Sequence, residues 1–352
     1  MKCCIIPDDV LKKIKDKHTL ENSEAIRDFR ASVVLKKASK VPVPGDHDEV
    51  RILYDAHNSL VLNEDEANII EVDYEQEHKN TGSSVELEMF DKTYDFFRQK
   101  LGMESYDNRD SIWKIFQHFG KQYNNAFWNG KVFVFGDADK VFFETFWIQD
   151  ICTHEAMHAV TGYVTQLQYV GQSGALNEHI SDVIAICLVN FLQQVGQWKW
   201  VIGEGVWTKN IKGKGLRTFT LEPAYDDPII GRDGQPKHMK DYANLPNDKK
   251  HDMGGVHINS GILNHAFYSF VYRSGKKPFE EPLNIWWKAV QRTKAFDDFA
   301  AFAYNTIEAS IYYGDTQLLE HLQAAWFDVG INPKERKWTF WDSIKLSLSR
   351  FH

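Results

Sequence analysis

The sequence predicts an α+β protein with two domains, the first rich in β-strands and the second a bundle of helices. Short runs rich in Ile, Leu and Val, separated by Asn, Asp and Glu, predict strands over 51–54, 59–62 and 68–72. Further on, apolar residues three and four apart predict helices over 261–272, 284–292, 296–312 and 316–329. The 352 residues, 43% of them hydrophobic, are enough for two such domains.

We place three segments after the N-terminus. Residues 49–195 form the β-rich domain, which contains a helix over 84–100 and a strand over 132–137. Residues 196–330 form the helical domain, and its first part includes a long irregular loop rich in Gly, Pro, Asp and Asn. Residues 331–352 form an amphipathic helix, which packs on its own domain or, alternatively, forms a dimer contact.

One stretch carries two histidines four residues apart, His154-Glu155-Ala156-Met157-His158. Residues i and i+4 share one face of a helix, so both imidazoles can bind one metal ion. Glu155 follows the first histidine, and its carboxylate can take a proton from a water molecule at that metal; this assignment of roles is a standard one for the motif. A buried helix with two hydrogen-bonded histidines is the alternative interpretation.

A second stretch supplies a third metal ligand. Glu178 and Asp182 are again four residues apart, and an apolar run over 183–192 follows them. Glu178 completes a set of three protein ligands, the number that leaves a fourth position of zinc open for water. Asp182 and Asn177 are positioned to accept the free ring N–H groups of the two histidines. An exposed charged helix face, the other interpretation, fits poorly with the apolar surroundings of Glu178.

The sequence resembles the thermolysin-like zinc endopeptidases, and most closely their protealysin-like branch. Four motifs in the same order carry the resemblance, which extends from about Arg51 to Gly330: NNAFWNG at 124–130, HEAMH at 154–158, NEHISD at 177–182 and GGVHINSG at 254–261. It implies a two-domain thermolysin-like fold with the active site in the cleft between the domains. It also implies a neutral endopeptidase that uses one catalytic Zn²⁺ to hydrolyse internal bonds of protein or peptide substrates.

The resemblance implies two further catalytic groups. Tyr169 and His257 would donate hydrogen bonds to the oxyanion that develops on the substrate, and Asp252 would orient His257. A turn containing Gly254 and Gly255 would present His257 ahead of the helix over 261–272. Single histidines and tyrosines are usually structural, so these roles depend on position relative to the motifs.

The resemblance also implies which residues bind the substrate. Asn125 and the carbonyl of Ala126 would hold the substrate main chain at an exposed strand edge, and Arg217 would donate to a substrate carbonyl. A turn at Asn125 and a surface salt bridge of Arg217 are the alternatives. The pocket for the residue after the cleaved bond, which is expected to be bulky and apolar, would be lined by Ile151, Ile202 and Leu216.

Residues 1–48 form a separable N-terminal segment. Val41-Pro42-Val43-Pro44-Gly45 cannot continue a helix, and we interpret it as an exposed linker. Protealysin-like precursors begin with a short propeptide that carries Ile-Pro-Pro and a leucine three residues later. Ile6, Pro7 and Leu11 match this pattern, whereas Asp8 replaces the second proline, so the match alone does not predict that the segment docks in the cleft. An ordinary N-terminal arm is the alternative.

The segment contains the adjacent thiols Cys3 and Cys4. A thiolate is a good zinc ligand, so one of them could displace the catalytic water and keep a precursor latent together with Pro7. A reactive thiol without a partner is the commoner case. The chain has four cysteines in all, which do not form a disulfide framework.

Charge and hydropathy exclude several partners. A net charge of −8 without a basic stripe argues against a nucleic-acid surface. We find no Sec-type signal at the N-terminus and no uninterrupted apolar stretch of about 18 residues, so we expect synthesis in the cytoplasm and no membrane span. The family resemblance suggests secretion, which would then follow a signal-independent route. The sequence does not predict the oligomeric state.

We expect no calcium at the double site that thermolysin-like enzymes often carry. The resemblance places five acids there, but only Asp150 and Glu204 match, and the other positions are Val189, Lys199 and Val201. Calcium requires six to eight oxygen ligands, and an ammonium group at Lys199 disfavours it further.

Two other classes of function compete with a zinc endopeptidase. A catalytically silent homologue that only binds its partners is one, and the complete set of ligands, base and oxyanion donors argues against it. An exopeptidase with the same metal chemistry is the other. It would require a charged anchor for the substrate terminus, and we find none.

Overall fold

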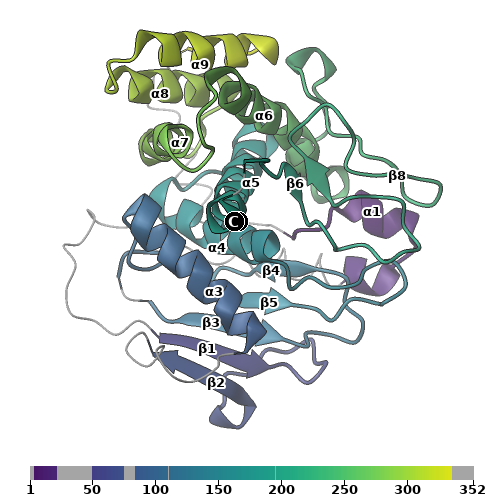
Figure 1. Cartoon of the computed structure of the whole chain (residues 1–352). Coiled ribbons are helices and arrows are strands. Elements are labelled where there is room, and N and C mark those ends of the chain that lie inside the picture. Colours follow the sequence, from purple (N-terminus) through teal and green to yellow (C-terminus); the bar gives the residue numbers. More distant parts are fainter. Residues whose placement is uncertain (1–3, 22–49, 75–83, 110, 195, 335–352) are drawn as a thin grey trace.

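The computed structural model describes residues 4–21, 50–74, 84–109, 111–194 and 196–334. Its N-terminal domain contains a five-stranded sheet with the strand order β2-β1-β3-β5-β4, as Figure 1 shows. The strands are β1 (Val50–Asp55), β2 (Ile69–Tyr74), β3 (Trp113–Gln117), β4 (Ala126–Trp128) and β5 (Phe133–Phe135). The central pairs β1–β3 and β3–β5 are parallel, whereas β4 pairs antiparallel with β5 and lies at one edge.

The expected strands at 51–54, 68–72 and 132–137 are confirmed as β1, β2 and β5, but the strand expected at 59–62 is wrong. β1 pairs directly with β2, and residues 59–62 lie in the connecting loop, where Val61 is 74% exposed. The residue pattern predicted neither β3 nor β4, although the resemblance placed Asn125 and Ala126 at an exposed strand edge. Both strands are largely buried, so they lack the alternation of apolar and polar residues that marks a half-exposed strand.

Helix α3 (Val85–Phe96) covers the sheet, as Figure 1 shows. Its first turn is capped by Ser84, whose side chain accepts the Leu87 N–H at 3.4 Å. A π-helical turn over Phe97–Leu101 extends it, and Gly102 ends it in the left-handed conformation with φ 65°. The helix expected over 84–100 is therefore confirmed. Phe90 packs against the rings of strands β3 and β5.

Helix α5 (Gly171–Gln193) lies at the centre of the molecule, between two other long helices. It packs against α4 (Gln149–Val164) and against α6 (Asp252–Ser274). Among the described residues α5 is also the one helix long and apolar enough to cross a membrane, but 83% of its apolar window is buried inside the protein. Its composition is therefore that of a core helix, and the helices α7 (Glu281–Arg292), α8 (Phe299–Ile311) and α9 (Thr316–Asp328) complete the helical domain.

The start of α6 differs from the helix expected over 261–272. The helix begins at Asp252, and Met253, Gly254 and Gly255 have positive φ values before it becomes regular. A Cβ on Gly254 would lie 2.4 Å from Asn247 Oδ1, so a side chain has no room there. His257 therefore lies in the first regular turn of the helix, not in a turn ahead of it.

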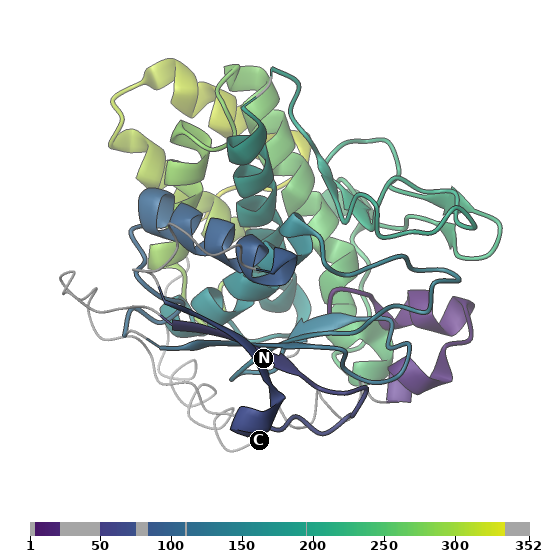
Figure 2. The same ribbon diagram turned by 60° about the horizontal axis from the view of Figure 1, so that its bottom comes forward.

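The N-terminal segment lies against the β4 edge of the sheet, where Ile6 bonds to Asn125, 119 positions further along the chain. Helix α1 (Asp8–Lys13) is seen there in Figures 1 and 2, beside the loop that contains the short strands β8 (Asp226–Asp227) and β9 (Gly231–Arg232). The linker expected at 41–46 and the tail beyond Lys334 lie outside the described residues, as does Cys3.

Candidate active site and metal centre

Helices α4 and α5 bring the three predicted metal ligands together. His154 and His158 lie one turn apart on α4, and Glu178 faces them from α5. All three side chains are fully buried, and one ligand atom from each lies within 4.8 Å of the others.

The hydrogen bonds of the two imidazoles favour a metal ion. His154 Nδ1 lies 2.9 Å from Asp182 Oδ1, and His158 Nδ1 lies 2.7 Å from Asn177 Oδ1. These acceptors hold the ring protons on Nδ1, so each Nε2 carries a lone pair. The two Nε2 atoms are only 2.9 Å apart, so their lone pairs repel each other unless a proton or a metal ion lies between them.

Carboxylates around the histidines favour positive charge at this site. Burial alone would lower the pKa of His154, but hydrogen bonds and charge from Asp182 and Glu178 raise it to about 9. Glu178 Oε2 is buried without a hydrogen-bond partner among the described residues and lies 3.5 Å from His154 Nε2. Two nitrogens and one carboxylate are the donor set of a catalytic zinc site with an open fourth position, so the residues fit Zn²⁺.

The side chain of Glu155 extends from α4 to the edge strand β4. Its carboxylate is buried, and its Oε2 accepts the backbone N–H of Trp128 in β4 at 2.8 Å. This hydrogen bond holds the carboxylate next to the histidines and at the strand edge. The sequence did not reveal the contact, because a backbone donor has no residue signature.

Tyr169 and His257 both lie next to Glu178. The Tyr169 hydroxyl donates to Glu178 Oε1 and lies 3.2 Å from His257 Nε2. His257 Nδ1 lies 2.6 Å from Asp252 Oδ1, and the backbone N–H of His257 donates to Asp252 Oδ2 at 2.8 Å. Asp252 therefore holds both the ring and the main chain of His257.

The charge of Asp182 is balanced by a residue that we expected at the substrate. Arg217 Nε and Nη2 donate to the two Asp182 oxygens at 3.0 and 2.8 Å, and Asn264 Nδ2 donates to Oδ2 at 2.9 Å. Burial alone would raise the pKa of Asp182, but Arg217 and His154 hold it well below its usual range. The part played by Asn264 was missed, because only the packing of α6 on α5 brings it there.

The N-terminal segment occupies the residues expected to bind a substrate main chain. The Ile5 N–H donates to the Ala126 carbonyl at 3.0 Å, and Arg217 Nη1 donates to the Ile5 carbonyl at 3.1 Å. Asn125 binds the next residue twice: its Oδ1 accepts the Ile6 N–H at 2.9 Å and its Nδ2 donates to the Ile6 carbonyl at 3.3 Å. The cleft therefore already holds a peptide segment of the chain itself.

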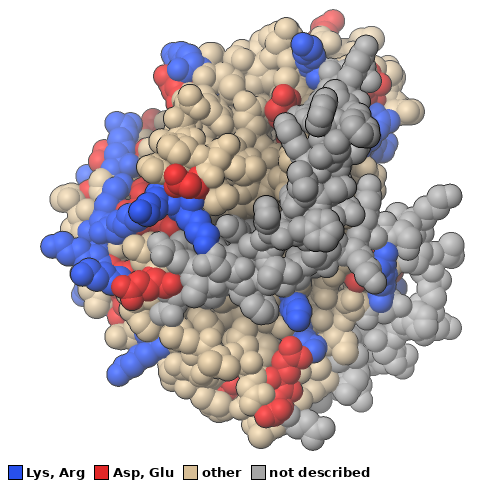
Figure 3. Space-filling model, turned by 180° about the vertical axis from the view of Figure 1, so that it is seen from behind, with Lys and Arg blue, Asp and Glu red and all other residues tan. Residues whose placement is uncertain are grey.

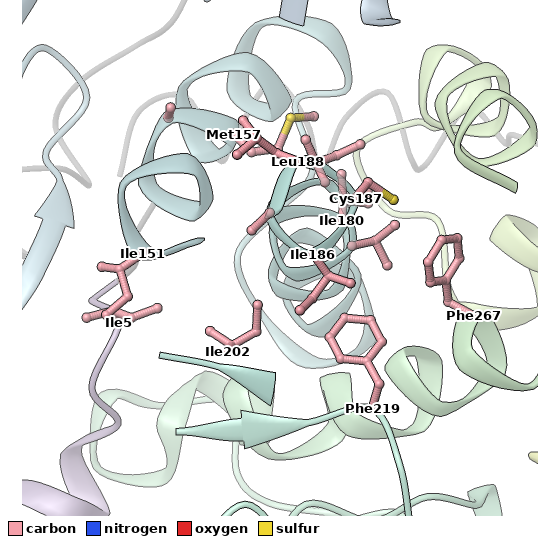
Figure 4. Close-up of a cluster of buried hydrophobic side chains, with 14 of the residues drawn as sticks. Ile5, Ile151, Met157, Ile180, Ile186, Cys187, Leu188, Ile202, Phe219 and Phe267 are labelled. Atoms are coloured by element: carbon pink, nitrogen blue, oxygen red, sulfur yellow. The ribbon is translucent and has the colours of Figure 1, made fainter. Parts of the chain in front are cut away.

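The side chain of Ile5 enters the expected apolar pocket. Figure 4 shows the Ile5 side chain next to Ile151, with Ile202 nearby. All three side chains are fully buried. Leu216, the third residue expected in this pocket, is joined to Ile202 by a hydrogen bond from its N–H to the Ile202 carbonyl at 2.8 Å. Cys4, by contrast, packs in a second apolar cluster with Phe119 and Phe127. The buried metal-binding group found in the described part of the chain does not include it.

A buried site that attracts a divalent cation, with a carboxylate beside it and a peptide held along its rim, is the site of a metalloendopeptidase. Two comparisons identify the family. Residues 38–162 match the catalytic domain of the thermolysin metallopeptidases, and residues 165–331 match their α-helical domain. The chain belongs to this family, whose enzymes are zinc-dependent, and the two-domain thermolysin-like fold expected from the sequence is confirmed.

Several proteins are similar over most of their length. An extracellular metalloprotease of Pectobacterium carotovorum subsp. carotovorum is 31% identical over 95% of this chain and 97% of its own length. Protease PrtS of Photorhabdus sp. is 33% identical over 81% of this chain and 77% of its own. The solved structure of the precursor of protealysin, a metalloproteinase from Serratia proteamaculans, matches with a TM-score of 0.78 and 33% identity, over 94% of this chain and 99% of that one.

We predict that Glu155→Gln retains zinc and loses peptide hydrolysis. The substitution leaves His154, His158 and Glu178 in place but removes the group that takes the proton, which costs roughly 10²- to 10⁴-fold in rate. Zinc content and cleavage of an end-blocked peptide measure the two effects. His158→Ala is the matched control, which loses both, and a Glu155→Gln protein with full activity would contradict the role of Glu155.

We also predict an alkaline limit that depends on Asp252. Burial alone would lower the pKa of His257, but the Glu178 and Asp252 carboxylates raise it to about 9. The imidazolium is therefore kept at neutral pH and lost as the pH rises through about 9. A metal ion would offset the charge of Glu178, which leaves Asp252 as the carboxylate that keeps the pKa of His257 raised. Asp252→Asn should therefore lower this pKa and move the alkaline limb of kcat/KM to lower pH. The exposed Asp226→Asn serves as control, and an unmoved limb would rule out His257 as the donor.

Proposed function

We propose that His154, His158 and Glu178 hold one zinc ion and that the enzyme cleaves internal peptide bonds with a bulky apolar residue after the cleaved bond. The observation that carries this proposal is the chain's own Ile5, held by its main chain at the cleft rim with its side chain against Ile151. Recognition through N–H and C=O groups accepts many sequences, while the pocket selects one side chain.

The chain's own residues divide the chemical work. When bound, zinc polarises the scissile carbonyl and lowers the pKa of water. Glu155 takes the proton from that water and delivers it to the leaving amine. Tyr169 and His257 donate to the developing oxyanion, where loss of one such donor typically costs ~10²- to ~10³-fold in turnover.

End-blocked peptides test this function. We expect cleavage that stops with a zinc chelator and returns with zinc, and a kcat/KM for Leu or Ile after the cleaved bond roughly 10- to 200-fold above that for Ala. Blocked ends exclude an exopeptidase, since no free terminus remains. Failure to cleave any end-blocked peptide would favour the exopeptidase or the silent homologue.

The N-terminal segment, we propose, is a propeptide that keeps the precursor latent until residues 1–48 are removed. Beyond Ile5 and Ile6, a second anchor supports this proposal. Thr19 Oγ1 accepts the Asn124 N–H at 3.0 Å, and Asp16 Oδ2 accepts the Asn124 side-chain amide at 2.8 Å. A role of Cys3 or Cys4 at the metal would require the segment to shift, because Cys4 packs elsewhere.

Weakening the second anchor should raise the activity of the uncut chain. Thr19→Val fills the same space but leaves the buried Asn124 N–H without its acceptor, at a cost of about 1–2 kcal/mol, or roughly 5- to 30-fold in docking. Initial rates on a peptide, taken before any change in mass, report the effect. Thr19→Ser keeps the hydroxyl and is the control; equal rates for the two variants would argue against latency through this anchor.

At the usual double calcium site we propose that no calcium binds. Lys199 Nζ lies 2.8 Å from Glu204 Oε2, and the two Asp150 oxygens each accept the Gly203 N–H at 3.1 Å. Burial raises the pKa of Asp150 to about 7, so this carboxyl is partly neutral at neutral pH. The melting temperature of the zinc-loaded protein should therefore be equal with added calcium and with a calcium-specific chelator, and a clear rise with calcium would contradict this.

For partners, we propose protein or peptide substrates outside the cell and no nucleic acid. The relative from Pectobacterium is named an extracellular metalloprotease. On the face drawn in Figure 3, the described basic and acidic side chains lie next to one another, which offers phosphates no continuous basic stripe.

A further inference from the structure

The N-terminal segment runs antiparallel to the edge strand β4. Ile5 bonds to Ala126, while the following residue, Ile6, bonds to the preceding one, Asn125. Residues 125 and 129 turn their backbone groups towards β5, as the Gly136 N–H to Asn125 carbonyl and the Asn129 N–H to Val132 carbonyl bonds show. Ala126 and Trp128 therefore present theirs to the open edge.

This direction places the peptide group between Cys4 and Ile5 next to Glu155. On the open edge of β4 the position after the Ala126 carbonyl is the Trp128 N–H, and Glu155 Oε2 accepts that N–H at 2.8 Å. Because the segment is antiparallel, Cys4, the described residue before Ile5, lies from Ala126 towards Trp128. The Cys4–Ile5 bond is thus presented to the carboxylate that follows the metal ligand His154.

The side chains of Cys4 and Ile5 lie in different places, which fixes the register of the segment. Cys4 packs with Phe127 in one apolar cluster, whereas Ile5 points to the other side, towards Ile151. Arg217 holds the Ile5 carbonyl, and Asn125 holds Ile6 on both its N–H and C=O. A shift of the segment by one residue would move Ile5 out of the pocket at Ile151, bring a different side chain against Phe127, and break these hydrogen bonds.

We propose that the enzyme cuts its own chain between Cys4 and Ile5, a step that rests on the proposed function. The oxygen of a water molecule forms a bond to the Cys4 carbonyl carbon while Glu155 takes a water proton. The bond from that carbon to the Ile5 nitrogen breaks, and the nitrogen receives the proton. The products are the peptide Met1–Cys4 with a new carboxylate and a chain that begins with Ile5.

This cut is distinct from removal of the whole segment. The hydrogen bonds of Ile6 with Asn125, and those of Asp16 and Thr19 with Asn124, all lie on the C-terminal side of the bond. They remain after the cut, so the trimmed segment stays in the cleft. Trimming therefore precedes activation and does not itself raise the activity on added peptides.

Intact mass and N-terminal sequencing of the zinc-loaded full chain over time test the proposal. We expect a product that begins Ile5-Ile6-Pro7, formed at a rate independent of protein concentration, and no such product from Glu155→Gln. Ile5→Asp puts a carboxylate into the apolar pocket and should abolish the cut. Because it also weakens the docking of the segment, its activity on end-blocked peptides should rise above that of the parent chain. Ile5→Leu, the matched control, should still be cut at the same bond.

The outcomes separate this inference from the proposed function. A protein that cleaves end-blocked peptides but keeps the Cys4–Ile5 bond intact overturns the inference alone. The same N-terminus at Ile5 in Glu155→Gln also overturns it, because another peptidase would then have made the cut. A protein that cleaves neither its own chain nor any peptide contradicts both.

Discussion

A buried excess of negative charge between α4 and α5 is the constraint on which the site depends. Glu178 and Asp182 are both fully buried, and an isolated buried carboxylate is very costly. Arg217 balances Asp182 through two hydrogen bonds, whereas Glu178 faces the two imidazole Nε2 atoms. The pair of helices therefore favours positive charge at one point, and the tautomers set by Asp182 and Asn177 direct the nitrogen lone pairs of the neutral rings to it.

The second constraint is the open edge of the sheet. An edge strand presents unpaired N–H and C=O groups, which attract any extended chain. In this protein two of these groups on β4 have different partners: the Trp128 N–H donates to the Glu155 carboxylate, and the Ala126 carbonyl accepts the Ile5 N–H. One strand of three residues thus fixes the carboxylate and the peptide relative to each other. The same property that makes an edge prone to aggregation serves here for binding.

Docking of the N-terminal segment did not follow from its match to the propeptide pattern, since Asp8 replaces a proline. The structure explains why this replacement is tolerated. The contacts of Ile5 and Ile6 in the cleft use their main chain, which does not depend on the residue at position 8. Asp8 instead begins helix α1 directly after Pro7, where a carboxylate is stabilised by the N-terminus of a helix.

The sequence by itself determined the helices and strands whose apolar residues recur at regular intervals, and the site residues that are a fixed number of positions apart. His154, Glu155 and His158 follow from one helical turn, and Gly102 marks the end of a helix, because both are local properties of the backbone. Only the tertiary structure decided which distant groups meet: Trp128 with Glu155, Asn264 with Asp182, and Ile5 with Ala126. These contacts join main-chain groups or packed helices, whose positions depend on the whole fold and leave no pattern in the sequence.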